Sequence, residues 1–455
     1  MSDEYRDLAE MFERSQVETY RPDPADPEVV KTRRRRRRRR LIAAGVVFLV
    51  FAAAVGTYLP LTLLAPVAAT PAAFAEPVVE QPGPVVFPTP AALATAVSVS
   101  GAEAEFPATA GTDGILNATG GNEARPIASI SKVISALVVL AAKPLNPGEA
   151  GPTLNFGKAE NDTYDKYYVL GATIAPMKIG SSMSQHDALA MMLMVSASNY
   201  AEVTTTWALG SQANFRSATK RWLDENGLTG TTMVEPTGID PRNTSTPTDL
   251  IAIARLAMAN PVVAELVGTK SAQLGSLGVQ QNRNNVLGID GIDGIKTGTL
   301  DEAGSCLLFS AVVSVGLDAP VTIVGVVLGA ANSATAGEVA RAQIAAVASG
   351  FHRVPLVTAG EPLGDYLTPW DDSAGIIAGE TGALLSWSDA PVSVTSEIDP
   401  VGIAEDGAEV GAEVGSLTFT VGSRTVTVPL ELDGAIDGPG GWWRLTHPRE
   451  LLFEQ

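Results

Sequence analysis

The feature that most constrains this 455-residue chain is an uncharged apolar run directly behind a block of arginines. Arg33–Arg40 are eight consecutive arginines, and Leu41–Leu64 follow with 24 residues that carry no charged side chain. As a helix rising about 1.5 Å per residue, this run reaches about 36 Å, enough to cross a hydrocarbon core of about 30 Å. Arginine-rich flanks stay in the cytoplasm, so the run predicts a single-pass helix with the C-terminal part of the chain outside the cell.

Two other interpretations of this segment are open. An arginine block can bind nucleic acid, but this one abuts an apolar span. Residues 1–65 carry 12 Lys and Arg against 9 Asp and Glu, a net charge of +3. Because the net charge of the whole chain is −19, the remaining residues carry −22. That acidic remainder argues against nucleic acid as a partner. A signal peptide cleaved after Ala75 is the second interpretation, although the apolar run is longer than most such signals.

The composition along the chain predicts five parts. Residues 1–40 are a cytoplasmic tail, residues 41–64 the membrane helix, and residues 65–100 a linker, because seven prolines lie between Pro66 and Ser100. Residues 101–350 mix helical and strand-like patterns and predict an α+β domain. Residues 351–455 hold short β-branched runs between turn residues and predict a β-rich module. Trp442 and Trp443 near its end fit either a membrane interface or packing against that module.

Three short motifs follow one another inside the α+β part. They are Ser129-Ile-Ser-Lys132, then Ser196-Ala-Ser198, then Lys296-Thr-Gly-Thr299. A Ser-x-x-Lys alone is weak, because Ser217-Ala-Thr-Lys220 also fits it. The ordered trio is typical of serine enzymes that open acyl–D-alanine bonds or β-lactam rings.

The stretch from Arg125 to about Ala348 resembles low-molecular-mass penicillin-binding proteins of the D-alanyl-D-alanine carboxypeptidase family. Further local matches are Pro236-Thr-Gly-Ile-Asp240 and the run that continues from Asp293 through the third motif to Gly304. The resemblance implies a penicillin-binding or β-lactamase-like domain, with an antiparallel sheet flanked by helices. It also implies a small C-terminal β domain, in agreement with the composition.

Spacing and charge indicate how the first motif could work. Three residues apart, Ser129 and Lys132 share one helix face. A lysine amine can accept the serine proton once burial and a nearby positive charge, here Lys296, lower its pKa. The resemblance assigns Ser129 as the acylated nucleophile, Lys132 as its general base and Ser196 as a proton relay.

The third motif should edge the cleft as a strand. Lys296 would supply positive charge, Thr297 and Thr299 can hydrogen-bond a substrate carboxylate, and Gly298 leaves space for a substrate strand. The resemblance places an oxyanion hole at the backbone N–H groups of Ser129 and Thr299.

The second motif departs from the family pattern, which ends in asparagine. Ser198 stands there and Asn199 follows, so we expect either weaker substrate positioning by Ser198 or a contact from Asn199 instead.

The chain lacks the residue patterns that other hydrolytic mechanisms require. The chain has three histidines and no Gly-x-Ser-x-Gly elbow beside them, which disfavours a Ser-His-Asp hydrolase. No His/Cys cluster suits zinc, and the single Cys306 excludes intrachain disulfides, so no metal or other cofactor is predicted.

The resemblance therefore implies a membrane-anchored serine D-Ala-D-Ala carboxypeptidase. It would act on peptidoglycan stem peptides and be inhibited by β-lactams. Two alternatives stay open: a class A-like β-lactamase, for which Glu235-Pro236 resembles part of a deacylating loop, and a non-catalytic wall-binding protein on the same fold. The sequence does not separate carboxypeptidase from endopeptidase action on crosslinks.

Overall fold

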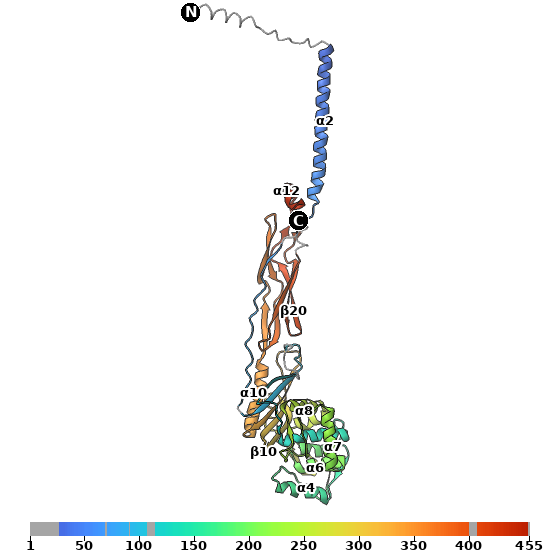
Figure 1. Cartoon of the computed structure of the whole chain (residues 1–455), viewed down its shortest axis with the longest axis vertical. Helices are drawn as coiled ribbons and strands as arrows, with labels where there is room; N and C mark the ends of the chain where they lie inside the picture. The colour runs from blue at the N-terminus through green and yellow to red at the C-terminus, as the bar shows by residue number, and fades with distance from the viewer. Residues whose placement is uncertain (1–26, 69–70, 91, 107–113, 400–406, 454–455) are drawn as a thin grey trace, which may run out of the picture.

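The computed structural model describes residues 27–68, 71–90, 92–106, 114–399 and 407–453. Figure 1 shows three parts stacked along one long axis. The N-terminal helix α2 (Pro27–Leu63) stands at one end, a β-rich module lies in the middle, and a domain of helices and a sheet forms the other end. The α+β class and the antiparallel sheet predicted from the sequence are confirmed.

Helix α2 joins the arginine block and the apolar run into one element of 37 residues. We expected the helix from residue 41 and a cytoplasmic tail over residues 1–40, but residues 27–40 are already helical, because arginine is a good helix former. Residues 1–26 of that tail lie outside the described residues. Val30–Leu63 is long and apolar enough to cross a membrane, and its apolar window is exposed throughout.

The main sheet of the α+β domain has five antiparallel strands in the order β10-β11-β12-β2-β3. Residues 94–100, which we expected in the linker, form β2. This strand is buried between β12 and β3, and its β-branched and small side chains suit that position. The apolar runs Cys306–Val315 and Val321–Leu328, joined by turn residues as two adjacent strands would be, form β11 and β12. The strand bounds are β2 Ala94–Ser100, β3 Ile115–Thr119, β10 Ile292–Leu300, β11 Gly304–Val313 and β12 Val321–Ala330.

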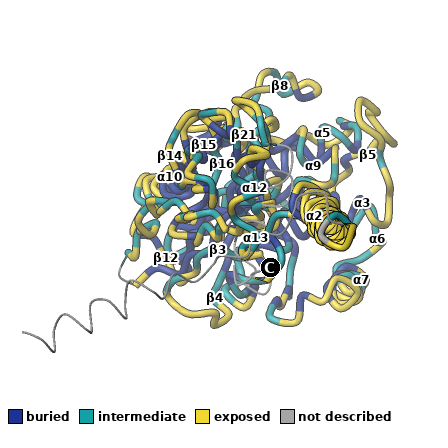
Figure 2. Tube along the Cα trace, turned by 90° about the horizontal axis from the view of Figure 1, so that it is seen from above, coloured by how far each residue is buried: buried dark blue, intermediate teal, exposed yellow. Residues whose placement is uncertain are grey.

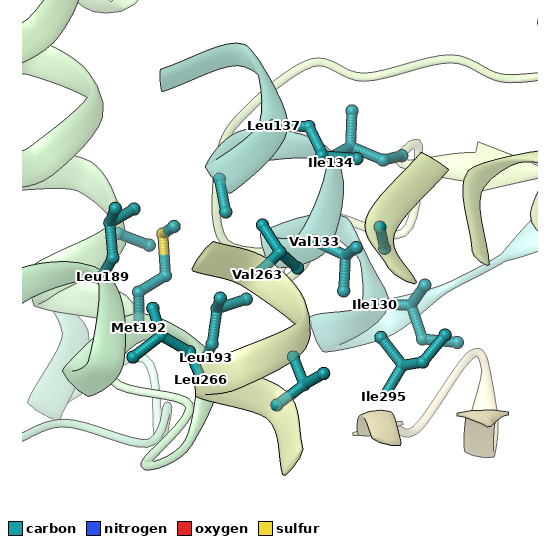
Figure 3. Close-up of a cluster of buried hydrophobic side chains, with 14 of the residues drawn as sticks. Ile130, Val133, Ile134, Leu137, Leu189, Met192, Leu193, Val263, Leu266 and Ile295 are labelled. Carbon is teal, nitrogen blue, oxygen red and sulfur yellow. The ribbon is translucent and has the colours of Figure 1, made fainter. Parts of the chain in front are cut away.

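Helices cover both faces of this sheet. Helix α10 (Ser333–Ser349) packs on one face, and α8 (Pro247–Ala259) packs on the other together with a group of helices. Side chains of η1, α3, α5, α9 and β10 meet in the apolar cluster of Figure 3. The remaining helices are η1 Ala128–Ile130, α3 Ser131–Ala142, α4 Lys158–Val169, α5 Gln185–Leu193, α6 Ser198–Leu209, α7 Gln212–Glu225, α9 Pro261–Gly268 and η2 Gly275–Leu277. Short paired strands are β4 Arg125–Pro126, β5 Thr153–Asn155, β6 Ser182–Ser184, β7 Thr244–Ser245, β8 Ser271–Gln273 and β9 Val279–Gln281.

The C-terminal module is built on a six-stranded antiparallel sheet in the order β1-β14-β15-β20-β19-β17. It ends in two short helices, α12 and α13, that the sequence did not predict. Its elements are β13 Phe351–Val357, β14 Pro362–Leu367, β15 Ser373–Ala378, β16 Gly382–Trp387, β17 Ser393–Ile398, β18 Gly407–Ala408, β19 Glu413–Val421, β20 Arg424–Leu432, β21 Ile436–Asp437, α12 Gly441–Thr446 and α13 Pro448–Leu452.

The proline-rich segment does not stand free between membrane and domain. Its residues Ala73–Phe74 form β1, which pairs with β14 of the C-terminal module. Further along, the Ser396 hydroxyl bonds the Glu76 carboxylate over 3.1 Å, and the Val85 N–H donates to Ser388 Oγ over 3.0 Å. The segment is therefore a strap along the module, visible in Figure 1 as the thin blue trace beside it.

An ion pair with a buried carboxylate and an aromatic group join the two domains. Glu105, only 1% exposed, accepts from Arg424 Nε of β20 over 2.5 Å. Beside it, the Phe106 ring meets Trp387 edge-on, with the ring centroids 5.2 Å apart. The loop after β2 is thus held on the C-terminal module by a charge pair at the edge of an apolar contact.

Candidate active site

The motif residues meet in a cleft of about 240 Å³ between strand β10 and the start of α3. The first and third motifs and the serine of the second all contribute. The cleft is lined by Ser129, Thr173, Ser196, Arg283, Thr297, Gly298, Thr299 and Ser333. Lys132 and Lys296 lie buried behind this lining, at 1% and 2% exposure.

Ser129 and Lys132 lie in contact at the beginning of the most buried helix. Ser129 occupies the short turn η1, and Lys132 follows in the first turn of α3. The Lys132 amine donates to Ser129 Oγ over 3.0 Å and to the Thr237 carbonyl over 2.6 Å. A neutral amine held this way can accept the serine proton, because its nitrogen is already within hydrogen-bond distance of the hydroxyl.

Burial makes a neutral amine attainable. It lowers the pKa of Lys132 to about 7, with Glu235 raising the pKa and Arg283 lowering it further. The pKa of Lys296 falls well below its usual value, mainly through burial and then through the positive charges of Lys132 and Arg283. Two buried amines and a guanidinium thus share one site, and their repulsion favours losing a proton from the lysines.

Gly298 has a second physical role besides the one expected. A Cβ there would lie 2.9 Å from the Ser129 backbone nitrogen and 3.1 Å from Ala128 Cβ. The missing side chain therefore lets strand β10 approach the turn that carries Ser129, in addition to opening the cleft. Gly238 does the same from the opposite side, since its Cβ would lie 1.8 Å from the Ala128 carbonyl oxygen.

The two serines of the second motif lie in different surroundings, and only Ser196 lines the cleft. Ser196 lines the cleft with a left-handed φ of 65°, a strained conformation for a serine. Ser198 begins α6, is 3% exposed, and donates its backbone N–H to the Thr173 carbonyl over 2.8 Å. Asn199 is fully buried, and its amide bonds both backbone groups of Ala175, at 3.1 and 2.8 Å. Asn199 therefore holds a loop, with its amide oxygen and its amide nitrogen each bonded to Ala175.

The Glu235 carboxylate also accepts hydrogen bonds from the backbone. Its carboxylate accepts the N–H groups of Thr237 and Gly238, at 2.7 and 2.6 Å, and the Asn243 amide at 3.0 Å. It thereby shapes the turn that presents the Thr237 carbonyl to Lys132. A carboxylate saturated in this way is poorly suited to activating a water, which weakens the β-lactamase alternative.

The family model for D-alanyl-D-alanine carboxypeptidases matches residues 91–332, more than half of the chain. The chain belongs to this family. The matched residues contain β2, all three motifs and the five-stranded sheet.

Two curated members are named D-alanyl-D-alanine endopeptidase. The one from Escherichia coli (strain K12) is 28% identical over 198 residues, which are 42% of this chain and 60% of that protein. The one from Pseudomonas aeruginosa has the same identity and coverage. The chain thus spans about 60% of the length of these relatives.

Solved structures share the penicillin-binding fold. A D-alanyl-D-alanine carboxypeptidase from Francisella tularensis has a TM-score of 0.50 and 17% identity, covering 80% of this chain and 97% of its own. Penicillin binding protein 5 from Haemophilus influenzae has a TM-score of 0.50 and 16% identity, covering 80% and 99%. These structural matches cover a larger share of the chain than the family model does.

Three residues that line this family member's cleft, Thr173, Arg283 and Ser333, were missed by sequence reasoning. Arg283 reaches the cleft from the loop before β10, where its backbone N–H bonds the Met194 carbonyl over 3.0 Å. Its guanidinium donates to Thr173 Oγ1 over 3.2 Å. No local pattern marks Arg283, since the segment Gln281–Asn284 is simply polar. In the described parts of the chain, no group of three or more His, Cys, Asp or Glu could hold a metal.

Proposed function

We propose that the protein is a serine-type D-Ala-D-Ala carboxypeptidase that removes the terminal D-alanine from peptidoglycan stem peptides. The observation that carries the proposal is the 3.0 Å contact between the Lys132 amine and Ser129 Oγ, with the pKa of Lys132 lowered to about 7. Family membership supports the same reaction class.

In the proposed reaction, Lys132 takes the proton of Ser129 as Oγ attacks the carbonyl carbon of the penultimate D-alanine. The C–N bond then breaks, and the leaving D-alanine amine gains a proton by way of Ser196 and Lys132. Water hydrolyses the remaining ester and returns the serine hydroxyl. A penicillin would acylate the same oxygen, and its opened ring stays attached, so hydrolysis is slow.

The far side of the cleft fits the substrate carboxylate. Arg283 is the cation in the lining, Lys296 lies buried behind it, and Thr297 and Thr299 bring hydroxyl and backbone donors on β10. Arg283 is the better placed charge at the surface of the cleft, because Lys296 is buried and donates to the Thr297 carbonyl over 3.0 Å. We assign carboxylate recognition to Arg283, Thr297 and Thr299, with Lys296 supporting them from behind.

Mass spectrometry of the purified full chain tests the proposal. After incubation with a D-Ala-D-Ala pentapeptide, free D-alanine and a tetrapeptide should appear. After incubation with penicillin, the chain should gain the mass of one drug molecule on the peptide that contains Ser129. Ser129→Ala should lose both results, whereas Ser217→Ala should keep them. A wild-type chain that shows neither would favour the non-catalytic alternative, and rapid penicillin turnover would favour the β-lactamase alternative.

Endopeptidase action on crosslinks is the second candidate, favoured by the names of the two curated relatives. A crosslinked stem-peptide dimer separates the two activities. Release of monomers from the dimer at a rate near that of D-alanine release would assign both reactions to the cleft.

We further propose that α2 anchors the chain in the cell membrane, with the arginine block in the cytoplasm and the α+β domain on the wall side. The arginine block and the apolar window of Val30–Leu63 support this orientation. Protease added to wall-stripped cells should digest the α+β domain and spare the N-terminal tail. Mature protein that begins at Glu76 would instead show cleavage after Ala75.

A further inference from the structure

A second hollow lies apart from the catalytic cleft, in the helical half of the α+β domain. Its volume is about 340 Å³, and its walls come from β5, α4 and α6, through residues within 154–163 and 202–207. Figure 1 shows α4 and α6 at the end of the molecule farthest from α2, and Figure 2 shows β5 and α6 on the same side of the molecule when it is seen from above. We call this hollow the α4–α6 pocket.

Two carboxylates on the walls are held in place and still have an oxygen to offer. Glu160 accepts the Gly157 N–H through Oε2 over 2.8 Å. Glu202 accepts the Lys166 amine through Oε2 over 2.5 Å, and the Tyr167 hydroxyl donates to the same atom. The Oε1 atom of each carboxylate is therefore left as a fixed acceptor for a ligand.

The other wall groups add donors and an aromatic ring. Thr206 Oγ1 accepts the Gln212 amide over 2.7 Å, which leaves its hydroxyl hydrogen to donate. Asn155 is exposed at the end of β5, and its amide can both donate and accept. The ring of Trp207 is half-buried against the core and lines the same pocket. The pocket thus combines donors, acceptors and one apolar ring.

This combination fits a saccharide better than a charged ligand. A sugar ring carries several hydroxyl groups that both donate and accept, and it has an apolar C–H face that can pack on an aromatic ring. An anion would meet the carboxylates of Glu160 and Glu202. An ammonium group would use those acceptors but leave the donors of Asn155 and Thr206 without a partner.

The pocket and the cleft share helix α6. Ser198 begins α6 two residues after Ser196 of the cleft. Glu202 and Trp207 then follow at rises of about 6 Å and about 14 Å along the helix, at about 1.5 Å per residue. Four extended peptide residues span about 13–14 Å. A sugar in the pocket and the end of its attached peptide in the cleft are therefore compatible in length.

We propose that the α4–α6 pocket binds an amino sugar of the glycan strand that carries the stem peptide. The inference rests on the proposed function, because the peptide attached to that sugar would present its end to Ser129. The consequence is selectivity for stem peptides on glycan over free peptides. Binding of the sugar raises the effective concentration of the peptide end at the cleft.

A ligand-observed NMR titration of the full chain in lipid nanodiscs tests binding. The probes are triacetylchitotriose, a neutral trisaccharide of amino sugars, and 1,5-diaminopentane, a cation. Asn155→Ala and, separately, Trp207→Phe alter the pocket, and the second keeps an aromatic ring against the core. Asn226→Ala and Trp442→Phe are the matched controls, since both residues are exposed and lie outside the pocket lining.

We expect the wild-type chain and both controls to bind the trisaccharide equally. Asn155→Ala should weaken binding by about 2-fold to 13-fold, the range for one lost hydrogen bond. Trp207→Phe should weaken it too, because the smaller ring covers less of the sugar. If the trisaccharide does not bind, or binds all variants alike, the pocket proposal is overturned. Binding of 1,5-diaminopentane alone would overturn it in favour of a cation site.

The second measurement is kcat/KM for D-alanine release from a free pentapeptide and from the same pentapeptide attached to a disaccharide. The ratio should favour the attached form in the wild-type chain and should fall in both pocket variants but in neither control. D-alanine release with an equal ratio in all variants would overturn the pocket proposal and leave the proposed function standing. Trisaccharide binding without D-alanine release from either substrate would uphold the sugar site and overturn the proposed function.

Discussion

At the scale of single residues, Lys132 is a base whose charge is set by its surroundings. Burial lowers its pKa to about 7, Glu235 opposes this and Arg283 adds to it. Only the neutral amine accepts a proton from Ser129, so acylation should be slow below the pKa and rise with pH through it. We expect the rate of penicillin acylation, followed by stopped-flow fluorescence, to reach half its maximum near pH 7.

Glu235→Gln should move that midpoint to lower pH, because it removes the charge that raises the pKa of Lys132. The exposed Glu225 on α7 gives a matched control, and Glu225→Gln should leave the midpoint in place. An unchanged midpoint in Glu235→Gln would mean that another group controls the pH dependence.

Replacing the lysine of each Ser-x-x-Lys motif in turn tests which of the two motifs is catalytic. Lys132→Ala should slow acylation by about 100-fold to 10,000-fold, the range usual for a lost general base. Lys220→Ala should not slow it, because Lys220 is an exposed residue paired with Asp224 over 2.8 Å. Rates of fluorescent-penicillin labelling measure both, and a dead Lys220→Ala would contradict the assignment.

Asn199 should matter for stability rather than for substrate binding. Asn199→Ala removes two buried hydrogen bonds to Ala175, which at about 0.5–1.5 kcal/mol each predicts a loss of about 1–3 kcal/mol in unfolding free energy. Denaturant unfolding measures the loss. Asn226→Ala, which removes one exposed bond, should cost less. A raised KM with unchanged stability would restore the expectation that Asn199 contacts substrate.

At the scale of elements, the site depends on glycines that let a turn and a strand approach the start of α3. Gly238→Ala should nearly abolish acylation, because the new Cβ would overlap the Ala128 carbonyl beside Ser129. Gly227→Ala is the control: its φ of 70° resembles the 80° of Gly238, but nothing lies within 4 Å of the new Cβ. Both changes should cost about 1 kcal/mol of stability through backbone strain, and only Gly238→Ala should lose labelling by penicillin. Equal labelling of the two variants would show that the turn can shift without harm.

Elements of the site could be predicted where a local pattern encodes them. Strands β11 and β12 follow from apolar runs around a turn, and α10 from a helical stretch closing the domain. Thr173 and Arg283 could not be predicted, because a backbone bond to the distant Met194 positions Arg283, which in turn bonds Thr173. The Glu105–Arg424 pair could not be predicted from the sequence either, because 319 residues separate its members. The hydrogen bonds of Asn199 could not be predicted either, because its partner Ala175 carries no polar side chain.

At the scale of the whole molecule, the joint between the two domains depends on a buried carboxylate. Arg424→Ala would leave Glu105, 1% exposed, without its cation, and a buried group without its partner costs about 1–3 kcal/mol or more. Thermal unfolding should shift down, and small-angle scattering should show a wider spread of domain arrangements. Adding Glu105→Gln should recover part of the loss. Lys158→Ala, which breaks an exposed pair with Asp162, should change neither measurement.

The strap has a consequence for the order in which the protein is made. Residues 65–100 are the first to emerge on the far side of the membrane if α2 stays as an anchor. Yet β1 pairs with β14, about 290 residues later, and β2 pairs with β12, more than 200 residues later. Pairing over such separations closes large loops and is slow. The earliest exported strand, β1, therefore waits unpaired until most of the chain has followed, whereas β2 can first pair with the nearby β3.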